Sequence, residues 1–396
     1  MALAKMIVSA ITETLPGERL VAVTPASAAI IAKLGVEVVT QAGCGITSHL
    51  NDEAYKKAGV SVATDRRDII SRSNVLLQVH ALGGDPLNQT DDLAALKPGT
   101  IIVGFADPLT NLQLVRTLAG CKATLLAMEL VPRITRAQNM DALSSLASIA
   151  GYRAVLLAAC RLGKIFPMMI TPAGTITASR IFVIGAGVAG LQAIATARRL
   201  GAQVSAFDVR PAVKEQVQSL GAKFVELPLN TANAQTTGGY AREQTAEEIQ
   251  QQRTLMMHAV AGSDVVIATA AVPGKKAPIL VTRDMVQAMV PGSVIVDLAA
   301  ARGGNCELTR ADEVVDVGGV TILGPTNMVA EAPVHASQMY ASNVANLLKH
   351  LVKDGNIALD TNDQITREML VLKDGEIVNE RVKNLLETPT AAHGEK

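Results

Sequence analysis

The sequence predicts an α/β protein made of two Rossmann-like, doubly wound domains with a nucleotide-binding cleft between them. Its 396 residues exceed the roughly 100–200 residues of one domain, which favours two. Short β-branched runs alternate with amphipathic stretches of about ten residues, the rhythm of βαβ units in a mainly parallel sheet. With 49% hydrophobic and 18% charged residues, the chain can bury a sizeable core.

The composition disfavours several function classes. Lys plus Arg and Asp plus Glu both total 36, so no net positive field draws nucleic acid or an anionic membrane surface. The chain has no Trp, four Tyr and five Phe, so nucleic-acid bases would find few stacking partners. Its four cysteines and six histidines show neither CxxC nor HxxxH spacing. We therefore expect no nucleic-acid partner and no metal site.

The first domain begins with an α/β series. A short apolar run at Met6–Val8 predicts the first strand, and Met1–Gly17 lacks the longer apolar stretch and cleavage site of a signal peptide. Four β-branched runs predict further strands, with one helix after the first of them. These are Leu20–Val23, Val36–Thr40, Val75–Val79 and Ile101–Phe105, and the helix is Ala26–Leu34.

A long helix is predicted to connect the two domains. Its pattern covers Leu143–Phe166, begins near Asp141 and ends before Pro167. This segment holds the best apolar stretch of the chain, which Gly151 and Arg153 interrupt. Because a membrane span needs about 18 or more consecutive apolar residues, we expect this chain not to cross a membrane.

The second domain is predicted to contain a complete nucleotide-binding sheet. Residues Leu229–Gln252 interrupt it with a long polar excursion, of the kind that forms lids or functional loops. Six candidate strands begin at Arg180 and continue at Val204–Phe207, Phe224–Val225, Val265–Ala268, Val294–Asp297 and Thr321–Leu323.

The chain is then expected to return to the first domain. A helical pattern at Val334–Val352 precedes a strand-like run at Met369–Val371 and a polar tail. We predict a discontinuous first domain of residues 1–142 plus 334–386, a second domain of residues 143–333, and a disordered tail at 387–396.

The sharpest motif is a glycine-rich turn between a strand and a helix. Residues Arg180–Ile184 lead into Gly185-Ala-Gly187-Val-Ala-Gly190, and a helical pattern follows. In such a fingerprint the first glycine permits the tight turn, the second lets the backbone approach a pyrophosphate, and the third lets the helix pack close to the strand. The phosphates then lie on the free amides and positive dipole end of the helix. The sequence therefore predicts a dinucleotide site.

An acidic residue at the end of the next strand selects the cofactor. Asp208 follows Val204–Phe207, where a carboxylate accepts hydrogen bonds from the adenosine ribose hydroxyls. A 2′-phosphate at this position would meet a like charge, so we expect NAD(H) rather than NADP(H). Arg210 is the counter-argument, because an Arg here can accommodate a 2′-phosphate.

Residues Glu18–Gly45 resemble the amino-terminal domain that alanine dehydrogenases share with nicotinamide nucleotide transhydrogenases. In the dehydrogenases a Lys and a His of this domain bind and deprotonate the substrate. Here the strand that would end in the Lys is Leu77–His80, and Val103–Pro108 has no His. Arg19, which would bind the substrate carboxylate, is present. A stand-alone NAD-dependent alanine dehydrogenase is therefore the alternative to a transhydrogenase.

Residues Val131–Ser145 resemble the Arg-Gln-Asp loop of transhydrogenases, and the likeness continues in the family's order over roughly residues 6–350. It implies the soluble NAD(H)-binding component of a proton-translocating transhydrogenase. It also implies that NADP(H) binds to a partner component, that a membrane component carries the protons, and that the chain forms homodimers. The expected location is the cytoplasmic side of the plasma membrane, where the partners would hold the chain. The other matching segments are Ala150–Ala154, Phe166–Met169, Gly190–Ala197 and Thr237–Ala241.

The resemblance also implies roles for individual residues. Those expected at the nicotinamide end are Arg133, Gln138, Asp141 and Ser144. Those expected to hold the rest of NAD(H), beside the three fingerprint glycines, are Val188, Asp208, Val209, Arg210, Gly239, Tyr240, Gln252 and Ala271.

The chemistry suits these residue types. Hydride transfer between two nicotinamides needs no general acid or base, because no heteroatom gains or loses a proton. It needs near contact of two rings, which is a positioning problem. Hydrogen-bonding side chains such as Arg133, Gln138 and Asp141 can fix a carboxamide and a ribose. One alternative is an interdomain loop whose Asp141 and Ser144 cap the long helix. Another is a binding module that senses NAD(H) without transferring hydride.

Overall fold

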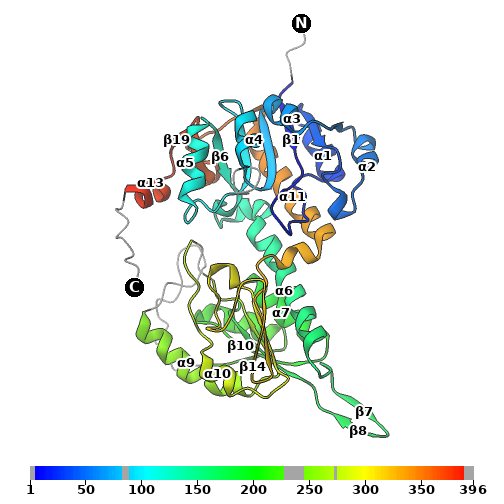
Figure 1. The fold of residues 1–396 in the computed structure, drawn as a ribbon, viewed down its shortest axis with the longest axis vertical. Helices are drawn as coiled ribbons and strands as arrows, with labels where there is room; N and C mark the ends of the chain where they lie inside the picture. Colours follow the sequence, from blue (N-terminus) through cyan, green and yellow to red (C-terminus); the bar gives the residue numbers. More distant parts are fainter. Residues whose placement is uncertain (1–4, 83–88, 227–244, 272–273, 388–396) are drawn as a thin grey trace. The chain divides into compact units, whose positions relative to one another are not determined.

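The computed structural model describes residues 5–82, 89–226, 245–271 and 274–387 (Figure 1). The chain forms two compact units, unit 1 from residues 1–146 and 332–396, and unit 2 from residues 147–331. Each unit has its own sheet with helices packed against it, so the predicted fold class of two Rossmann-like domains is confirmed. The predicted tail at 388–396 lies outside the described residues.

The sheet of unit 1 has the strand order β19-β18-β6-β5-β4-β1-β2-β3. Strands β1 to β6 are parallel, and the order reverses between β1 and β4, which creates a switch point. The antiparallel pair β18 and β19 extends the β6 edge. The strands are β1 Ile7–Ala10, β2 Glu37–Gln41, β3 Ser61–Ala63, β4 Val75–His80, β5 Ile101–Phe105, β6 Thr124–Ala127, β18 Leu370–Lys373 and β19 Glu376–Ile377.

Helices from both ends of the chain pack in unit 1. The long α11 (Pro333–Leu351) packs against α1 (Pro25–Ala32) and buries a stripe that includes Tyr340, Val344 and Leu348. The other helices are α2 Asp52–Lys57, α3 Arg66–Arg72, α4 Gln89–Ala95, α5 Leu112–Gly120, α12 Gln364–Met369 and α13 Glu380–Glu387, and a small hairpin joins β16 Val352–Lys353 to β17 Asn356–Ile357.

The predicted strand at Leu20–Val23 is wrong. The segment is buried but irregular, and side chains rather than a neighbouring strand accept its first two amides. The amide of Leu20 donates to the Glu18 carboxylate at 2.8 Å, and the amide of Val21 donates to Ser337 Oγ at 3.0 Å. A burial pattern alone does not reveal this difference, because a buried irregular segment and a buried strand carry the same apolar residues.

The sheet of unit 2 has the strand order β11-β10-β9-β12-β13-β15-β14, and its switch point lies between β9 and β12. The six predicted strands are present and parallel. A seventh, antiparallel strand, β14, was not predicted. The strands are β9 Arg180–Ile184, β10 Gln203–Phe207, β11 Lys223–Phe224, β12 Val265–Ala268, β13 Val294–Asp297, β14 Val314–Val317 and β15 Val320–Leu323.

Strand β9 shows why helices cover both faces of this sheet. Its Ile181 and Val183 pack into one apolar cluster with helices α6 and α7, while Phe182 and Ile184 pack into a second cluster with α9. Successive side chains of a strand point to opposite faces, so a strand with four consecutive buried apolar residues, as in Ile181–Ile184, needs cover on both sides. The helices of this unit are α6 Ala142–Arg161, which starts in unit 1, α7 Val188–Arg199, α8 Lys214–Ser219, α9 Ala246–Ala261 and α10 Arg283–Gln287.

The connecting helix is shorter than predicted, because α6 ends at Arg161 and not near Phe166. Gly163 lies two residues beyond this end, and the chain after it is held outside the helix by hydrogen bonds from Ser179 to the carbonyls of Ile165 and Phe166. In the described part of the chain, α6 is the one helix long and apolar enough to span a membrane. Its Ala154, Val155 and Ala158 are fully buried in the core of unit 2.

Candidate functional site

The glycine-rich turn of unit 2 lies at the switch point, between the end of β9 and the start of α7. Gly185 has φ +91°, which favours glycine. A Cβ on Gly190 would lie 1.9 Å from the carbonyl oxygen of Gly185, so only glycine lets the helix pack this close to the strand. Gly187 is different, since the nearest atom to its Cβ position is an Arg210 nitrogen at 3.9 Å. The backbone is therefore open where a pyrophosphate would approach.

The start of α7 suits an anion. Gly187 occupies the cap position and supplies no side-chain hydrogen bond to the amides of the first turn. Val188, the first helical residue, is half-buried. Unsatisfied amides at a helix amino terminus bind phosphate through hydrogen bonds and the helix dipole. This geometry fits the predicted dinucleotide.

Asp208 lies directly after β10 and is tied to the glycine-rich turn. Its Oδ2 accepts the amide of Ala186 at 2.7 Å, and its Oδ1 accepts the amide of Arg210 at 2.8 Å. The Arg210 guanidinium forms two further bonds to the carboxylate, at 2.9 and 2.8 Å. Its hydrogen bond with Asp208 raises the pKa of Arg210. The cation that could have held a 2′-phosphate is therefore bound to the carboxylate instead.

Helix α9 carries a buried amide with no partner. Gln252 is fully buried, and neither its Oε1 nor its Nε2 has a hydrogen bond within the described residues. An unsatisfied buried amide is costly, so a ligand that supplies both a donor and an acceptor would stabilise it. The predicted contacts Val209 and Ala271 are half-buried and exposed, respectively, while Gly239 and Tyr240 lie outside the described residues.

The predicted nicotinamide residues follow β6 in unit 1. Residues Thr135–Met140 form a short 3-10 helix, η3, on which Gln138 is exposed, and Arg133 is exposed just before it. Asp141 caps α6: it accepts the amide of Ser144 at 2.9 Å and the Ser144 hydroxyl at 2.6 Å. In this structure Asp141 and Ser144 thus form a cap at the start of α6, which is the alternative that the sequence left open. Their contacts with nucleotide remain predictions.

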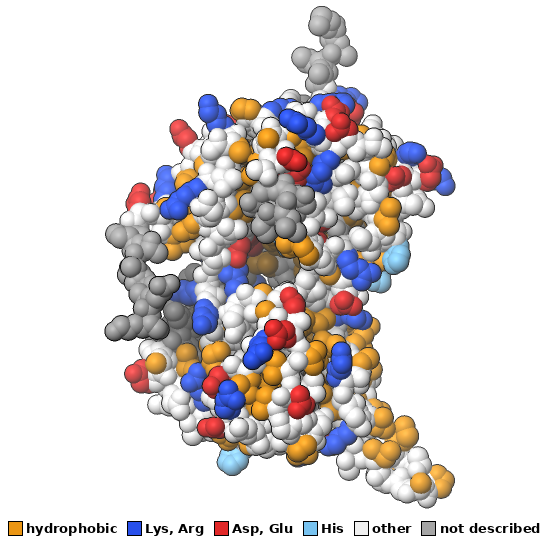
Figure 2. Space-filling model, viewed as in Figure 1, with side chains coloured by type: hydrophobic (Ala, Val, Ile, Leu, Met, Phe, Trp, Pro, Cys, Tyr) orange, Lys and Arg blue, Asp and Glu red, His pale blue; other side chains and the backbone are white. Residues whose placement is uncertain are grey.

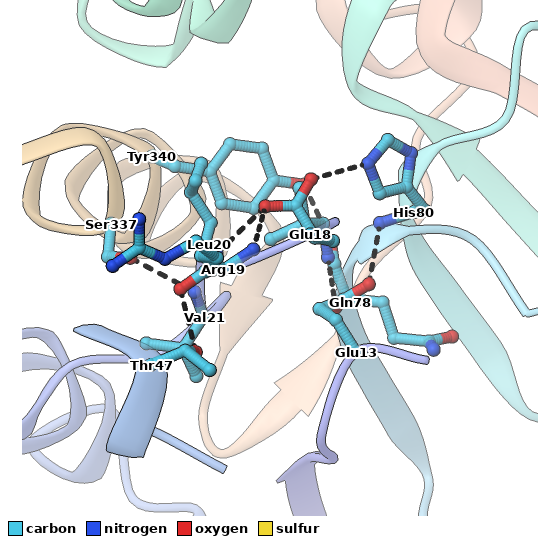
Figure 3. Close-up of polar contacts among 11 residues, drawn as sticks. Glu13, Glu18, Arg19, Leu20, Val21, Thr47, Gln78, His80, Ser337 and Tyr340 are labelled. Atoms are coloured by element: carbon cyan, nitrogen blue, oxygen red, sulfur yellow. Dashed lines mark hydrogen bonds and ion pairs between the residues drawn. The ribbon is translucent and has the colours of Figure 1, made fainter. Parts of the chain in front are cut away.

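Sequence reasoning missed a cluster of ionisable groups at the switch point of unit 1 (Figure 3). Glu13 follows β1 and accepts the amides of Val79 and His80, at 2.7 and 3.1 Å, from the end of β4. Glu18 accepts the amides of Arg19 and Leu20 with one oxygen and contacts His80 Nε2 at 2.8 Å with the other. The signal was available, because Glu13, Glu18 and His80 all follow or end strands that meet at this edge.

Burial and charge act against each other in this cluster. Burial raises the pKa of Glu13 to about 7, against the lowering effect of His80. Burial alone would raise the pKa of Glu18 and lower the pKa of His80. The hydrogen bond and the attraction between the two side chains outweigh burial, so the pKa of Glu18 is lowered and the pKa of His80 is raised. The His80 imidazole is therefore held by the Glu18 carboxylate and is not free to act as a base.

Glu129 and Tyr340 complete the same edge. Glu129 follows β6, and one of its oxygens accepts the amides of Ala106 and Asp107, while the other is buried with no partner in the described ranges. Burial raises the pKa of Glu129 to about 7. Tyr340 on α11 donates to the carbonyl oxygen of Gln78 at 2.7 Å. No Lys takes part in any of these contacts, and no three His, Cys, Asp or Glu side chains of the described residues converge as metal ligands.

Comparison with known proteins identifies relatives along nearly the whole chain. The family models for the alanine dehydrogenase/PNT N-terminal and C-terminal domains match residues 10–150 and 154–380. A protein of Rickettsia prowazekii, named as the first part of NAD(P) transhydrogenase subunit alpha, is 42% identical over 97% of this chain and 99% of its own length. The crystal structure of transhydrogenase from Sinorhizobium meliloti is 42% identical, has a TM-score of 0.84, and covers 94% of this chain and 100% of that one. An alanine dehydrogenase of Mycolicibacterium smegmatis is 25% identical over 97% of this chain and 98% of its own length.

The unpartnered Glu129 oxygen predicts a pH effect on stability. A carboxyl whose pKa rises on folding, here from 4.5 to about 7, stabilises the fold at low pH, and this contribution is lost as the pH rises through 7. Glu129→Gln keeps an acceptor for both amides and removes the charge. We expect wild type to lose on the order of 1–3 kcal/mol of unfolding free energy between pH 5 and 8 through this group, and E129Q to lose less.

Urea unfolding at the two pH values measures this difference. Glu53→Gln is the matched control, because Glu53 is an exposed carboxylate that pairs with Lys56 in the same unit. An E129Q protein with the same pH dependence as wild type would show that Glu129 is not the titrating group.

Proposed function

Because this chain belongs to the alanine dehydrogenase/PNT family and is a transhydrogenase component within it, we propose that it binds NAD(H) and exchanges hydride with NADP(H) held by a partner. The membrane component of the complex would couple this exchange to proton translocation. One observation carries the proposal: the glycine-rich turn of unit 2 leaves its backbone open at Gly187, while at the switch point of unit 1 Glu13, Glu18 and His80 bind one another and the backbone.

That contrast separates the proposal from its alternative. A stand-alone alanine dehydrogenase needs a cation for the substrate carboxylate and a free base for its amine. In unit 1 the imidazole of His80 is bonded to Glu18, and no Lys joins it. Arg19 would remain the one feature of an amino-acid site. Hydride exchange between two nicotinamides requires none of these groups, so their loss or engagement does not impair it.

The residues of this chain would perform binding and orientation. The glycine-rich turn and the first turn of α7 would hold the pyrophosphate, and Asp208 the adenosine ribose. The side-chain amide of Gln252 would form hydrogen bonds with the bound nucleotide. Gln138, exposed on η3, would orient the nicotinamide end together with Arg133, Asp141 and Ser144. No side chain is required to move a proton during the transfer.

Partners would supply the rest of the reaction. We infer an NADP(H)-binding component and a membrane component, with this chain peripheral at the cytoplasmic face of the plasma membrane. An NAD(H)-sensing module without hydride transfer is the remaining alternative.

A projecting hairpin supports a homodimer. Strands β7 (Met169–Thr171) and β8 (Gly174–Ile176) form an isolated two-stranded sheet, and Figure 2 shows apolar side chains on it at the lower right. Ile170 is 74% exposed and Met168 is 61% exposed, although both would be stabilised by burial. A two-stranded hairpin is marginally stable alone, so a second copy of the chain is the expected cover.

The function is tested by mixing the purified chain with a purified NADP(H)-binding component of a transhydrogenase. NADH oxidation coupled to reduction of NADP+ should appear only in the mixture. Oxidation of L-alanine with NAD+ by the chain alone would favour the dehydrogenase instead. Tight NADH binding without transfer in the mixture would favour the sensing module.

We predict that Asp208→Asn changes nucleotide preference. Wild type should bind NADH far better than NADPH, because the carboxylate repels a 2′-phosphate. The Asn removes this repulsion, keeps hydrogen-bonding capacity and frees Arg210, so NADPH binding should improve relative to NADH by roughly tenfold or more, about 1.4 kcal/mol. Calorimetry measures both affinities, and Asp264→Asn, which loses an ion pair with Lys164 elsewhere in unit 2, is the control. Equal affinities of wild type for the two nucleotides would disprove this role of Asp208.

We predict that Gln138→Asn slows hydride transfer much more than it weakens NADH binding. The shorter side chain displaces the ring contact by about 1 Å, which can cost on the order of a hundredfold in rate. The dissociation constant should stay within a few-fold, because Gly185–Gly190 and Asp208 hold the rest of the nucleotide. Stopped-flow transfer with the partner and equilibrium binding measure the two effects, with exposed Gln113→Asn as the control. Transfer near the wild-type rate would make the loop a structural linker.

We predict that Ile170→Asp lowers the dimer content. A charge on the hairpin would have to be buried without a partner at the proposed interface, which is costly. Light scattering after size-exclusion chromatography measures the mass, and Val290→Asp, at a position that is 52% exposed, is the control. A wild-type monomer, or equal dimer content in both variants, would contradict this role of the hairpin.

A further inference from the structure

The loop that carries Gln138 is attached to the returning C-terminal segment at two points. The first is Asn139, whose carbonyl oxygen accepts Asn343 Nδ2 at 2.9 Å and Asn346 Nδ2 at 3.2 Å. Both asparagines lie on α11, which packs against η3. Asn343 is 5% exposed, so its hydrogen bond is protected from water, whereas Asn346 is half-buried.

The second attachment is an ion pair at Arg136. Its Nη1 lies 2.6 Å from Asp363 Oδ1. Asp363 is itself fixed from two sides, because its Oδ2 accepts the amide of Thr366 at the start of α12 and contacts His350 Nε2 of α11, both at 2.9 Å. Although burial acts in the opposite direction, the hydrogen bonds from Thr366, His350 and Arg136 lower the pKa of Asp363. The carboxylate thus stays charged at neutral pH and is held in one orientation.

Gln138 lies between these two points. Residues Thr135–Met140 form only a six-residue 3-10 helix, in which Gln138 is exposed. Helices of this type have poorer hydrogen-bond geometry than α-helices and rarely persist alone. The loop therefore needs contacts outside its own backbone to stay ordered, and besides the buried side chains of Ala137 and Met140 it has the bonds from Asn343, Asn346 and Asp363.

We propose that Arg136, Asp363, Asn343 and Asn346 are positioning residues for hydride transfer, which hold the Gln138 loop in the geometry that the reaction needs. This inference rests on the proposed function. We infer that these four residues contact neither nucleotide and act only through the loop that they hold. A reaction that depends on the approach of two rings is sensitive to loop displacements that ordinary binding tolerates.

The experiment compares Arg136→Gln and Arg136→Lys with wild type. R136Q removes the ion pair and leaves Asp363 free to cap α12, so the fold should remain intact. Arg72→Gln is the matched control, because Arg72 pairs with Asp68 on the surface of the same unit. Asn346→Ala removes the longer of the two bonds to Asn139 and is expected to have a smaller effect than R136Q.

Two measurements are made. In the isolated chain, hydrogen exchange of residues 134–141 should become faster in R136Q, with an unchanged melting temperature. With the NADP(H)-binding partner, single-turnover hydride transfer should fall by roughly tenfold or more, while the NADH dissociation constant changes less than about twofold. R136K retains the positive charge, so both its loop exchange and its transfer rate should lie between those of R136Q and wild type.

The outcomes separate the two claims. Unchanged loop exchange in R136Q refutes the attachment, and faster exchange with a wild-type transfer rate refutes its role in positioning. A fall in melting temperature with weaker NADH binding would show a structural role only. If the wild-type chain transfers no hydride with the partner, the proposed function fails, whatever the loop exchange shows.

Discussion

The architecture of unit 2 depends on one close backbone contact, between the carbonyl of Gly185 and the Cα of Gly190. No side chain fits there, since a Cβ on Gly190 would lie 1.9 Å from that oxygen. The contact seats α7 on β9, directs the first amides of the helix to the switch point, and leaves Ala186 where Asp208 can accept its amide. Gly151 extends the arrangement, because its missing Cβ lets α6 lie against the carbonyl of Ala189. The open helix terminus at which we propose that the dinucleotide binds thus follows from three glycines whose requirement is steric.

The two switch points of the chain have the same topology and opposite chemistry. In unit 2 the edge is open, with uncapped amides and an unsatisfied buried amide at Gln252. In unit 1 the carboxylates of Glu13 and Glu18 accept backbone amides, and Glu18 also contacts His80, so these three side chains are engaged with one another and with the backbone. Under the proposed function, this difference would let one family fold serve amino-acid dehydrogenation in some members and nucleotide-to-nucleotide hydride transfer in this chain. The fold places a switch point at the edge of each sheet, and a few side chains there determine whether a small substrate can bind.

Much of the fold was predictable because its signals are local. The β-branched runs of unit 2 matched their strands, and the fingerprint was recognisable from its glycines and the strand before them. The resemblance to transhydrogenases is confirmed by the relatives. The errors arose where distant residues decide the structure. Leu20–Val23 is not a strand because Glu18 and Ser337 take the amides of Leu20 and Val21, and the chain beyond α6 is held outside the helix by Ser179, which donates to the carbonyls of Ile165 and Phe166. The Arg136–Asp363 pair is likewise set by tertiary contacts over a long sequence separation, which no pattern reveals.

The central claim is that hydride passes directly from NADH on this chain to NADP+ on a partner, with no proton-exchanging intermediate on either protein. The most direct measurement uses NADH deuterated at the transferred position of C4, mixed with this chain, the NADP(H)-binding partner and NADP+. The account predicts that the deuterium appears at C4 of NADPH and that none enters water. Deuterium in the solvent, or NADPH without label, would contradict it.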